Sequence, residues 1–291
     1  MLLYQRTDRP IEVTLDLPGL GLFAHLNVIA GMTMRLGRRN RPFRVRCVTP
    51  NYAVTGNEDW FATLFDHTAA PALDGQSSRL HIRRQAHMPT AWRGEMLSRL
   101  SVENGFLRQF RVARRWQEEV DRFVAAHFQG EPTLGLHYRG TDKSLEAERV
   151  DYSVVISRLR DCCDRHGLQR VFVATDEHAF LETLRSTPDL PVDIVAQSHV
   201  ARSTGSKPMH LGHAPRKGSH AAADALVDCL ILARCAALLK TWSALSGWSA
   251  LFAPRIPVEF LNRTHPQGWF FPDNILTNEP PTPRVPLTRR P

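Results

Sequence analysis

The sequence predicts an α/β fold made of two Rossmann-like domains that face each other across a cleft. Strand-like and helix-like segments alternate along the chain, and such alternation favours parallel sheets built from βαβ units. A Gly-Glu-Pro break at 130–132 separates two alternating sets. We therefore expect an N-terminal domain over 1–129, a C-terminal domain over 130–275 and an irregular proline-rich tail over 276–291.

The first alternating set begins with a strand, a Gly-Leu-Gly turn at 19–21 and an apolar helix. Its expected strands are 11–16, 43–49 and 79–83, and its expected helices are 22–38, 59–65 and 106–128. The last helix is long and amphipathic, because its apolar and aromatic residues recur near helical spacing.

The second alternating set follows the break. Its expected strands are 134–138, 171–175, 192–196 and 258–261, and its expected helices are 153–165, 178–186, 221–239 and 246–252. The segment 221–239 is apolar nearly all round, which predicts a helix buried in the layers of the sheet.

Composition and charge indicate a globular protein suited to an anionic ligand. A hydrophobic fraction of 43% and a charged fraction of 23% are ordinary for a globular protein. The surplus of 37 Lys and Arg over 29 Asp and Glu gives a net charge of +8, which suits an anionic ligand. The arginines are scattered, and their local clusters lack interleaved stacking aromatics, so no specific nucleic-acid partner is expected.

The cysteines and apolar segments predict a cytoplasmic protein of bacterial style. The five cysteines are an odd set without the spacing of a disulfide framework or a zinc site, which indicates a reducing compartment. We recognise no signal peptide at the N-terminus and no run of about 18 uncharged apolar residues, so no transmembrane segment is expected. The sequence does not indicate an oligomeric state.

A phosphate-binding set of donors follows the strand at 134–138. Arg139 can form a bidentate, charge-assisted bridge to a phosphate, and Gly140 lets the backbone approach it closely. The carboxyl ends of parallel strands are where open α/β sheets bind ligands. The alternative is that Arg139 and Asp142 form a surface ion pair at the end of the strand.

The strand 171–175 also ends in polar residues. Thr175, Asp176 and Glu177 follow its apolar part directly. Either Thr175 or Asp176 caps the helix that begins at His178, or the segment contributes to an anion site at the helix N-terminus. Both functions are compatible.

Two carboxylates lie four residues apart on the apolar helix. Asp224 and Asp228 share one face of that helix, and Lys-Thr-Trp-Ser follows it at 240–243. A buried carboxylate needs hydrogen-bond donors, and the N1–H and N2–H₂ groups of guanine form a matched pair. The alternatives are a favourable first-turn charge for Asp224 and a buried salt bridge to an arginine for Asp228.

These three runs resemble, in order, the motifs of GDP-fucose-dependent fucosyltransferases of the α1,6-fucosyltransferase and protein O-fucosyltransferase superfamily, which includes rhizobial nodulation fucosyltransferases. The first run matches His-x-Arg-x-Thr-Asp-Lys, the second an apolar strand ending in Ala-Thr-Asp, and the third Asp-x-x-x-Leu-x-x-Cys followed by Thr-aromatic-Ser. The resemblance covers 134–252. It implies a GT-B fold and a metal-independent, inverting transfer of fucose from GDP-fucose to a glycan hydroxyl.

The resemblance also implies roles for individual residues. Arg139 and Glu146 are the expected catalytic residues, as the stabiliser of the leaving phosphate and as the general base. The expected donor-binding residues are His137, Arg139, Asp142, Lys143, Thr175, Asp176, Asp228, Thr241 and Ser243. The chain has no Asp-x-Asp pair, so neither a metal nor a cofactor is expected beside the donor GDP-fucose.

Two positions depart from the family pattern. Ala147 stands where the family has a glutamate, so Glu146 is the preferred base, with Asp142 or Glu177 as alternatives. Ala244 stands where the family has a second serine, and Ser243 or Ser246 is expected to replace its phosphate contact.

The N-terminal domain offers fewer candidates. His25 and Asn27 are polar residues at the start of an apolar helix, so they are expected on the acceptor side of the site, with a core role for the histidine as the alternative. Tyr52 and Trp60 suggest an aromatic surface for sugar stacking.

Two alternative functions remain open for the whole chain. One is a GT-B enzyme with another nucleotide-sugar donor, and the other is a non-catalytic basic scaffold that binds nucleic acid.

Overall fold

The structure is a computed structural model of the whole chain. It describes residues 9–37, 41–50, 52, 58–75, 77–84, 99–140, 148–188, 190, 192–200, 202–203, 219–262 and 271–278. The chain divides into two compact units, the first from 1–121 and 208–227 and the second from 122–207 and 228–291. The expected domain limits, 1–129 and 130–275, stay a prediction.

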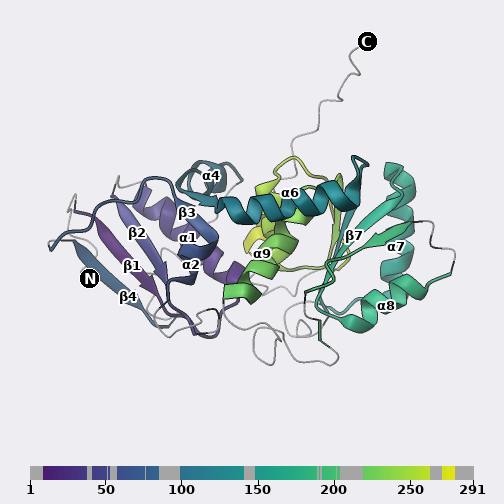
Figure 1. The fold of residues 1–291 in the computed structure, drawn as a ribbon, viewed down its shortest axis with the longest axis horizontal. Coiled ribbons are helices and arrows are strands. Elements are labelled where there is room, and N and C mark those ends of the chain that lie inside the picture. Colours follow the sequence, from purple (N-terminus) through teal and green to yellow (C-terminus); the bar gives the residue numbers. More distant parts are fainter. Residues whose placement is uncertain are drawn as a thin grey trace, which may run out of the picture. The chain divides into compact units, whose positions relative to one another are not determined.

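A three-stranded parallel sheet lies at the centre of the first unit (Figure 1). Its strand order is β2 (Phe43–Cys47), β1 (Ile11–Leu15), β4 (Ser78–Ile82). Alternate residues of β1 are fully buried and those between are half-buried. The helix α1 (Leu22–Gly37) connects β1 to β2, as a crossover between parallel strands requires. These elements confirm the expected start of the chain.

The expected helix 106–128 is wrong, because a strand interrupts it. The chain forms α4 (Arg99–Asn104), α5 (Phe106–Gln109), β5 (Phe110–Val112) and α6 (Arg114–Phe128), and β5 pairs antiparallel with β3 (Phe65–His67), which follows α2 (Trp60–Leu64). The ring of Phe110 packs 5.1 Å from that of Phe61 and 5.2 Å from that of Phe106. Burial of this aromatic cluster together with pairing to β3 outweighs the helical periodicity of the segment.

A five-stranded parallel sheet lies at the centre of the second unit. Its strand order is β10 (Val258–Phe260), β9 (Ala237–Lys240), β6 (Leu134–Tyr138), β7 (Arg170–Thr175), β8 (Asp193–Val195). In chain order this is 5-4-1-2-3, the doubly wound order of a Rossmann sheet. The order reverses direction at β6 and β9, so their carboxyl ends form the topological switch point at which such sheets bind ligands.

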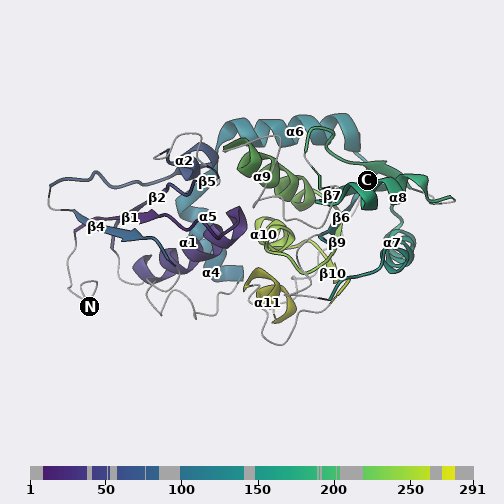
Figure 2. The ribbon, with the colours of Figure 1, turned by 90° about the horizontal axis from the view of Figure 1, so that it is seen from below.

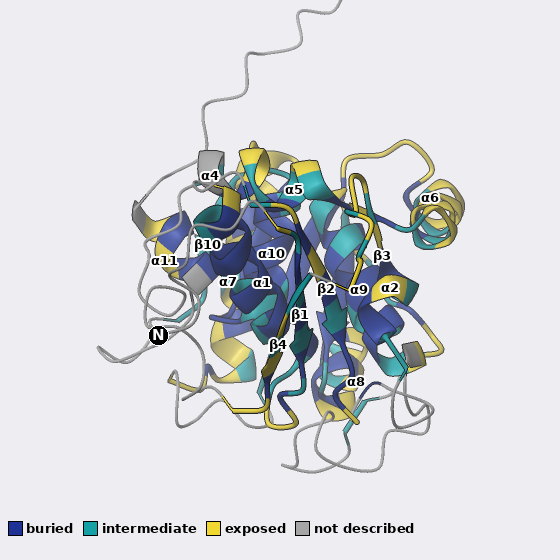
Figure 3. Cartoon of the chain, turned by 90° about the vertical axis from the view of Figure 1, so that its left-hand side faces the viewer, coloured by how far each residue is buried: buried dark blue, intermediate teal, exposed yellow. Residues whose placement is uncertain are grey.

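Helices cover both faces of this sheet (Figure 2). On one face Leu134, Leu136 and Tyr138 of β6 join a core with residues of α7 (Tyr152–His166) and α8 (His178–Ser186). On the other face Gly135 lies against α9 (Ser219–Ala233), and His137 meets α10 (Ala244–Phe252). All five residues of β6 are therefore buried, which explains why this strand shows no polar alternation. In the first unit, the helix α1 is mostly buried as well (Figure 3).

The expected helix 221–239 also needs correction at its end. The helix α9 stops at Ala233, and the buried strand β9 begins at Ala237. A helix buried all round and a strand buried on both faces are equally apolar, so periodicity does not separate them.

A last helix lies where the irregular tail was expected to begin. The helix α11 spans Phe271–Asn278, so 276–278 are helical, while 279–291 lie outside the described residues. Within the described ranges, no helix has the length and apolar character that a membrane span needs. The α/β class with parallel sheets is confirmed.

Candidate functional site

Hydrogen bonds at the switch point join the first predicted run to the third. The backbone N–H of Arg139 donates to Thr241 Oγ1 over 3.0 Å, and the backbone N–H of Thr241 donates to the carbonyl of His137 over 3.0 Å. Thr241 is 1% exposed, so its hydroxyl is a buried connector between the ends of β6 and β9. The backbone around Arg139 is thereby set by a residue about a hundred positions away.

Asp176 joins the second run to the same point. Its Oδ1 accepts the backbone N–H of Gly140 over 3.3 Å, and its Oδ2 lies 3.7 Å from Nε of Arg139. Both side chains are mainly buried, at 20% exposure for Arg139 and 13% for Asp176. The Asp176 carboxylate therefore orients the guanidinium of Arg139 by an ion pair between neighbouring strand ends. It also accepts the backbone N–H of Gly140, the residue that follows Arg139.

Glu177 is packed directly behind Gly140. Its Oε2 accepts the hydroxyl of Tyr152 over 2.6 Å, and Arg149 Nη2 lies 3.4 Å from its Oε1. Burial, and then the hydrogen bond to Glu177, raises the pKa of Tyr152 to about 12, so the phenol remains a donor. The Glu177 carboxylate is thus held inside the fold, which makes it a support for the turn.

Thr175 stabilises the turn that leads into α8. Its Oγ1 accepts the backbone N–H of Glu177 over 3.1 Å, and Glu177 occupies the N-cap position of the helix. Neither Thr175 nor Asp176 is therefore the N-cap residue that one reading of the sequence expected. Thr175 is 6% exposed, and its hydroxyl stabilises the local turn.

His137 and Ser246 form a buried pair on the opposite face of β6. His137 is 3% exposed, and its Nδ1 lies 2.8 Å from Ser246 Oγ. Ser246 is fully buried, so its hydroxyl supports the imidazole. Of the two serines expected to replace the missing phosphate contact, Ser243 lies two residues after Thr241 and occupies the N-cap position of α10.

A buried ion pair holds the segment that contains Thr241 and Ser243. Lys240 Nζ lies 2.6 Å from Asp273 Oδ1, and Asp273 Oδ2 accepts the backbone N–H of Ser243 over 2.8 Å. Both charged side chains are completely buried. Burial lowers the pKa of Lys240, and the charge of Asp273 opposes that shift. Sequence reasoning missed Asp273; its only local signal is an acidic residue in the first turn after Phe-Pro.

Asp228 is also buried, and a side-chain amide donates a hydrogen bond to it. Gln197 Nε2 donates to Asp228 Oδ1 over 2.6 Å, and the two residues are 2% and 6% exposed. Arg202 lies nearby: burial lowers its pKa, and the negative charge of Asp228 opposes that shift. The polar environment that a buried carboxylate needs is therefore present.

The remaining candidates fall into two groups. Asp142, Lys143 and Glu146 lie within 141–147, outside the described residues. In the first unit His25 is completely buried, with Nδ1 3.0 Å from the Gly21 carbonyl and Nε2 3.0 Å from Thr49 Oγ1.

These contacts favour the core role for the histidine. Asn27 is half-buried on α1, and its acceptor-side role stays a prediction. The expected aromatic surface is wrong for both described rings, because Tyr52 is 6% and Trp60 0% exposed. Both rings contact the imidazole edge-on, at centroid distances of 6.5 Å for Tyr52 and 5.1 Å for Trp60.

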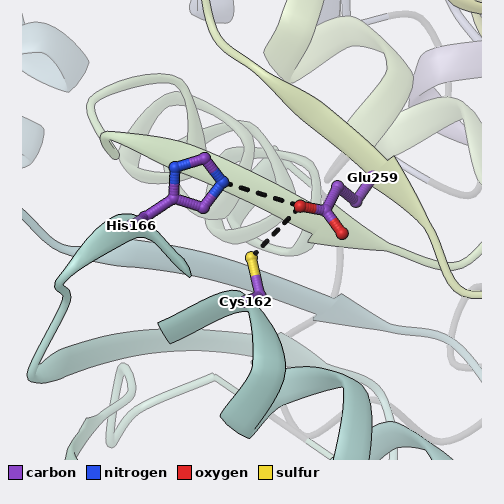
Figure 4. Close-up of side chains that lie close together, drawn as sticks. All are labelled: Cys162, His166 and Glu259. Carbon is purple, nitrogen blue, oxygen red and sulfur yellow. Dashed lines mark hydrogen bonds and ion pairs between the residues drawn. The ribbon is translucent and has the colours of Figure 1, made fainter. Parts of the chain in front are cut away.

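Among the described residues, one cluster brings together three side chains of the kinds that bind metals (Figure 4). Cys162 Sγ, a ring nitrogen of His166 and a carboxylate oxygen of Glu259 lie within 4.8 Å of one another. The carboxylate is already paired with Arg165 and lies 3.6 Å from Arg158. Burial, and then the charge of Glu259, raises the pKa of Cys162 to about 12, which keeps the thiol protonated. No metal is assigned to these residues.

The family of the chain follows from comparison with known sequences. The model of the family Nodulation protein Z (NodZ) matches residues 92–267, more than half of the chain. The chain belongs to the NodZ family. The matched region contains Arg139, Asp176, Asp228 and Thr241, so the resemblance expected from the three runs is confirmed.

A curated member of the NodZ family shows a distant relationship. Nodulation protein Z of Azorhizobium caulinodans is 27% identical over 167 residues, which are 53% of this chain and 49% of that protein. The chain thus spans about half the length of the curated relative that it matches.

Solved structures of NodZ proteins have a similar fold. A NodZ α-1,6-fucosyltransferase soaked with GDP-fucose superposes with a TM-score of 0.54 and 16% identity, over 86% of this chain and 94% of that chain. Fucosyltransferase NodZ from Bradyrhizobium gives a TM-score of 0.54 at 15% identity, over the same shares of the two chains.

A plant protein has a similar fold with a lower TM-score. A variant of Arabidopsis thaliana FUT1 in complex with GDP gives a TM-score of 0.50 at 11% identity, over 91% of this chain and 73% of that chain. At these identities the likeness shows the fold alone.

Proposed function

We propose that this NodZ-family chain is a metal-independent, inverting glycosyltransferase that transfers fucose from GDP-fucose to a glycan hydroxyl. The observation that carries the proposal is the meeting of Arg139, Asp176 and Thr241 at the switch point of a Rossmann sheet. Rossmann sheets bind nucleotides at this point, and a guanidinium there suits a diphosphate.

In the proposed reaction the acceptor hydroxyl attacks the anomeric carbon of fucose while the bond from that carbon to the β-phosphate oxygen breaks. The electron pair of the breaking bond leaves with GDP, and the hydroxyl proton passes to a carboxylate base. Arg139 stabilises the charge that develops on the β-phosphate, and Asp176 holds its guanidinium in position. Attack opposite to the leaving group inverts the configuration at the anomeric carbon.

The rest of the proposed donor site keeps the roles expected from the sequence. Asp228 accepts hydrogen bonds from guanine, and the segment of Thr241 and Ser243 binds near the diphosphate. Glu146 remains the proposed base, since the alternative Glu177 is engaged with Tyr152 and Arg149. Asp142 and Lys143 belong to the same proposed donor site.

The arrangement of the whole enzyme is part of the proposal. It is a GT-B transferase whose two domains face across a cleft, with the acceptor on the side of the N-terminal domain. A cytoplasmic location also stays a prediction. GDP-fucose and a glycan are the proposed partners, and no separate cofactor is proposed.

The decisive experiment follows GDP release from GDP-fucose and an acceptor glycan in the presence of EDTA. Chitooligosaccharide and lipopolysaccharide fragments are suitable acceptors to try first. Arg139→Ala is expected to reduce turnover roughly a hundredfold, about 3 kcal/mol, as loss of a charge-stabilising donor does. The matched control is Arg114→Ala, which removes a side chain that is 90% exposed.

Unchanged turnover in Arg139→Ala would contradict the proposed role, and loss of activity with EDTA would contradict metal independence. Thermal stabilisation by UDP in preference to GDP would favour a GT-B enzyme with another donor. Salt-dependent DNA binding without any GDP binding would favour the scaffold alternative.

A further inference from the structure

A buried hydrogen-bond donor lies beside the proposed guanine site. Among the described residues, Nε of Arg202 is buried and has no acceptor. The other two nitrogens of the same guanidinium are anchored: Nη2 donates to the Gln197 carbonyl over 2.9 Å, and Nη1 donates to the Val200 carbonyl over 3.2 Å. These two bonds hold the guanidinium plane, so they also fix the direction of the Nε–H bond.

Gln197 links this donor to the carboxylate of Asp228. Its side-chain amide donates to Asp228 Oδ1 over 2.6 Å, while its backbone carbonyl accepts from Arg202. One residue therefore fixes an acceptor group and a donor group relative to each other. Asp228 and Arg202 are also coupled electrostatically, because the carboxylate charge opposes the effect of burial on the arginine pKa.

The pair of groups matches the edge of a 6-oxopurine. Guanine presents the donors N1–H and N2–H₂ next to the acceptors O6 and N7, and arginine donating to O6 and N7 is a common specific contact to guanine. Adenine presents an acceptor at N1 and a donor at N6, so it would place like groups against both side chains. A carboxylate beside an arginine donor therefore selects the guanine edge.

We propose that Arg202 is a specificity-determining residue that donates its Nε–H to O6 of guanine while Asp228 accepts from N1–H and N2–H₂. Gln197 is the positioning residue, since its amide keeps Asp228 hydrogen-bonded when no base is present. This inference rests on the proposed use of a GDP donor. It adds recognition of the guanine O6 atom to a site in which Asp228 is the proposed partner of N1–H and N2–H₂.

The test changes single atoms of the base and measures dissociation constants by calorimetry. GDP, 6-thio-GDP and IDP are compared on the full chain: the sulfur of 6-thio-GDP is a weak acceptor, and IDP lacks only the 2-amino group. The wild-type chain is expected to bind GDP about tenfold more tightly than 6-thio-GDP, at the lower end of the discrimination typical of arginine–guanine contacts.

Arg202→Met is expected to bring this GDP to 6-thio-GDP ratio near one and to leave the GDP to IDP ratio unchanged, because the latter reports on Asp228. Arg202→Lys keeps the charge but lacks the Nε–H, and it is expected to lose the same selectivity. The control is Arg160→Met, which removes a guanidinium that donates to the Pro188 carbonyl on α7's side of the sheet.

The outcomes separate the two proposals. Equal binding of GDP and 6-thio-GDP by the wild-type chain overturns the inference without any mutation. The inference can therefore be tested even if the variants fold poorly. Equal weakening of both ligands in Arg202→Met also overturns it, since a structural loss does not depend on O6. Absence of GDP binding by the wild-type chain overturns the proposed function, and the inference with it.

Discussion

Gly140 shows how closely the proposed donor site is packed at the scale of one residue. A Cβ atom at this position would lie 2.6 Å from Cδ and 2.8 Å from Oε2 of Glu177. The carboxylate is held by the Tyr152 hydroxyl, so it cannot withdraw without losing that hydrogen bond. Glycine is required here by the close approach of a side chain to the backbone beside Arg139.

Gly140→Ala is therefore expected to destabilise the fold by about 1–3 kcal/mol, the usual cost of overpacking, and to weaken GDP binding. The displaced carboxylate leaves the Tyr152 hydroxyl without its partner, and the backbone next to Arg139 shifts. Urea unfolding and calorimetry with GDP measure the two effects.

A matched control is Gly37→Ala in α1, where a Cβ atom would meet nothing within 4 Å. Equal stability and GDP affinity in the two alanine variants would show that the contact with Glu177 has no consequence.

At the scale of elements, the helix α11 anchors the strand end that carries Thr241 and Ser243. Its Pro272 approaches α10 because position 247 is a glycine: a Cβ there would lie 2.6 Å from Pro272 Cβ. This approach brings the Asp273 carboxylate to Lys240 and to the backbone of Ser243. A short C-terminal helix thus sets the geometry of a loop about thirty residues earlier.

Asp273→Asn is expected to reduce the free energy of unfolding by about 3–5 kcal/mol, because it leaves Lys240 as a buried charge without its counter-charge. The double variant Lys240→Met, Asp273→Leu is expected to recover most of that loss, since an apolar pair replaces the ions. Denaturant unfolding of the single and double variants measures the coupling.

The double variant has a second use. It removes the acceptor for the Ser243 N–H, so we expect GDP binding to stay weak although stability returns. Recovery of both properties would mean that Asp273 only balances charge. Glu118→Gln, which breaks the exposed pair with Arg114, is the control and should cost at most about 1 kcal/mol.

At the scale of the whole molecule, the first unit contains a buried neutral histidine that couples folding to pH. Burial lowers the pKa of His25 to about 4, and the hydrogen bond to the Gly21 carbonyl opposes that shift. The folded pKa lies below the ordinary value of 6.5, so as the pH falls the unfolded chain takes up this proton first. Stability therefore decreases between pH 6.5 and about 4.

The expected loss across this window is up to about 3 kcal/mol from His25 alone. We expect His25→Gln to flatten the dependence of the unfolding free energy on pH between 7 and about 4.5. His220→Gln, at an exposed position of α9, is the control and should leave the slope as it is. Identical slopes for wild type and His25→Gln would show that the histidine does not couple folding to pH.

The elements that the sequence predicted well are those with a local signal. The strands β1, β6 and β7 and the helices α1, α7 and α8 lie within a few residues of their expected ranges. The strands β5 and β9 were hidden inside predicted helices, because their apolar residues fit both periods and only pairing with β3 or β6 decides between them.

The candidate site divides in the same way. Arg139 and Asp176 were predicted from residue type and from their place at the ends of strands, whereas Thr241 was predicted from the resemblance of its run to a family motif. The strand order brings the three together. Gln197 and Asp273 could not be predicted, because nothing in their neighbouring residues names the partners Asp228 and Lys240.

By itself the sequence determined the α/β class, the family and the three runs with their order, since these depend on composition and on residues close together in the chain. Only the tertiary structure decided that β6 lies next to β9, and hence that the backbone of Arg139 donates to Thr241 across 102 positions. The physical reason is that such contacts form only when both partners are buried together, and burial is a property of the folded chain as a whole.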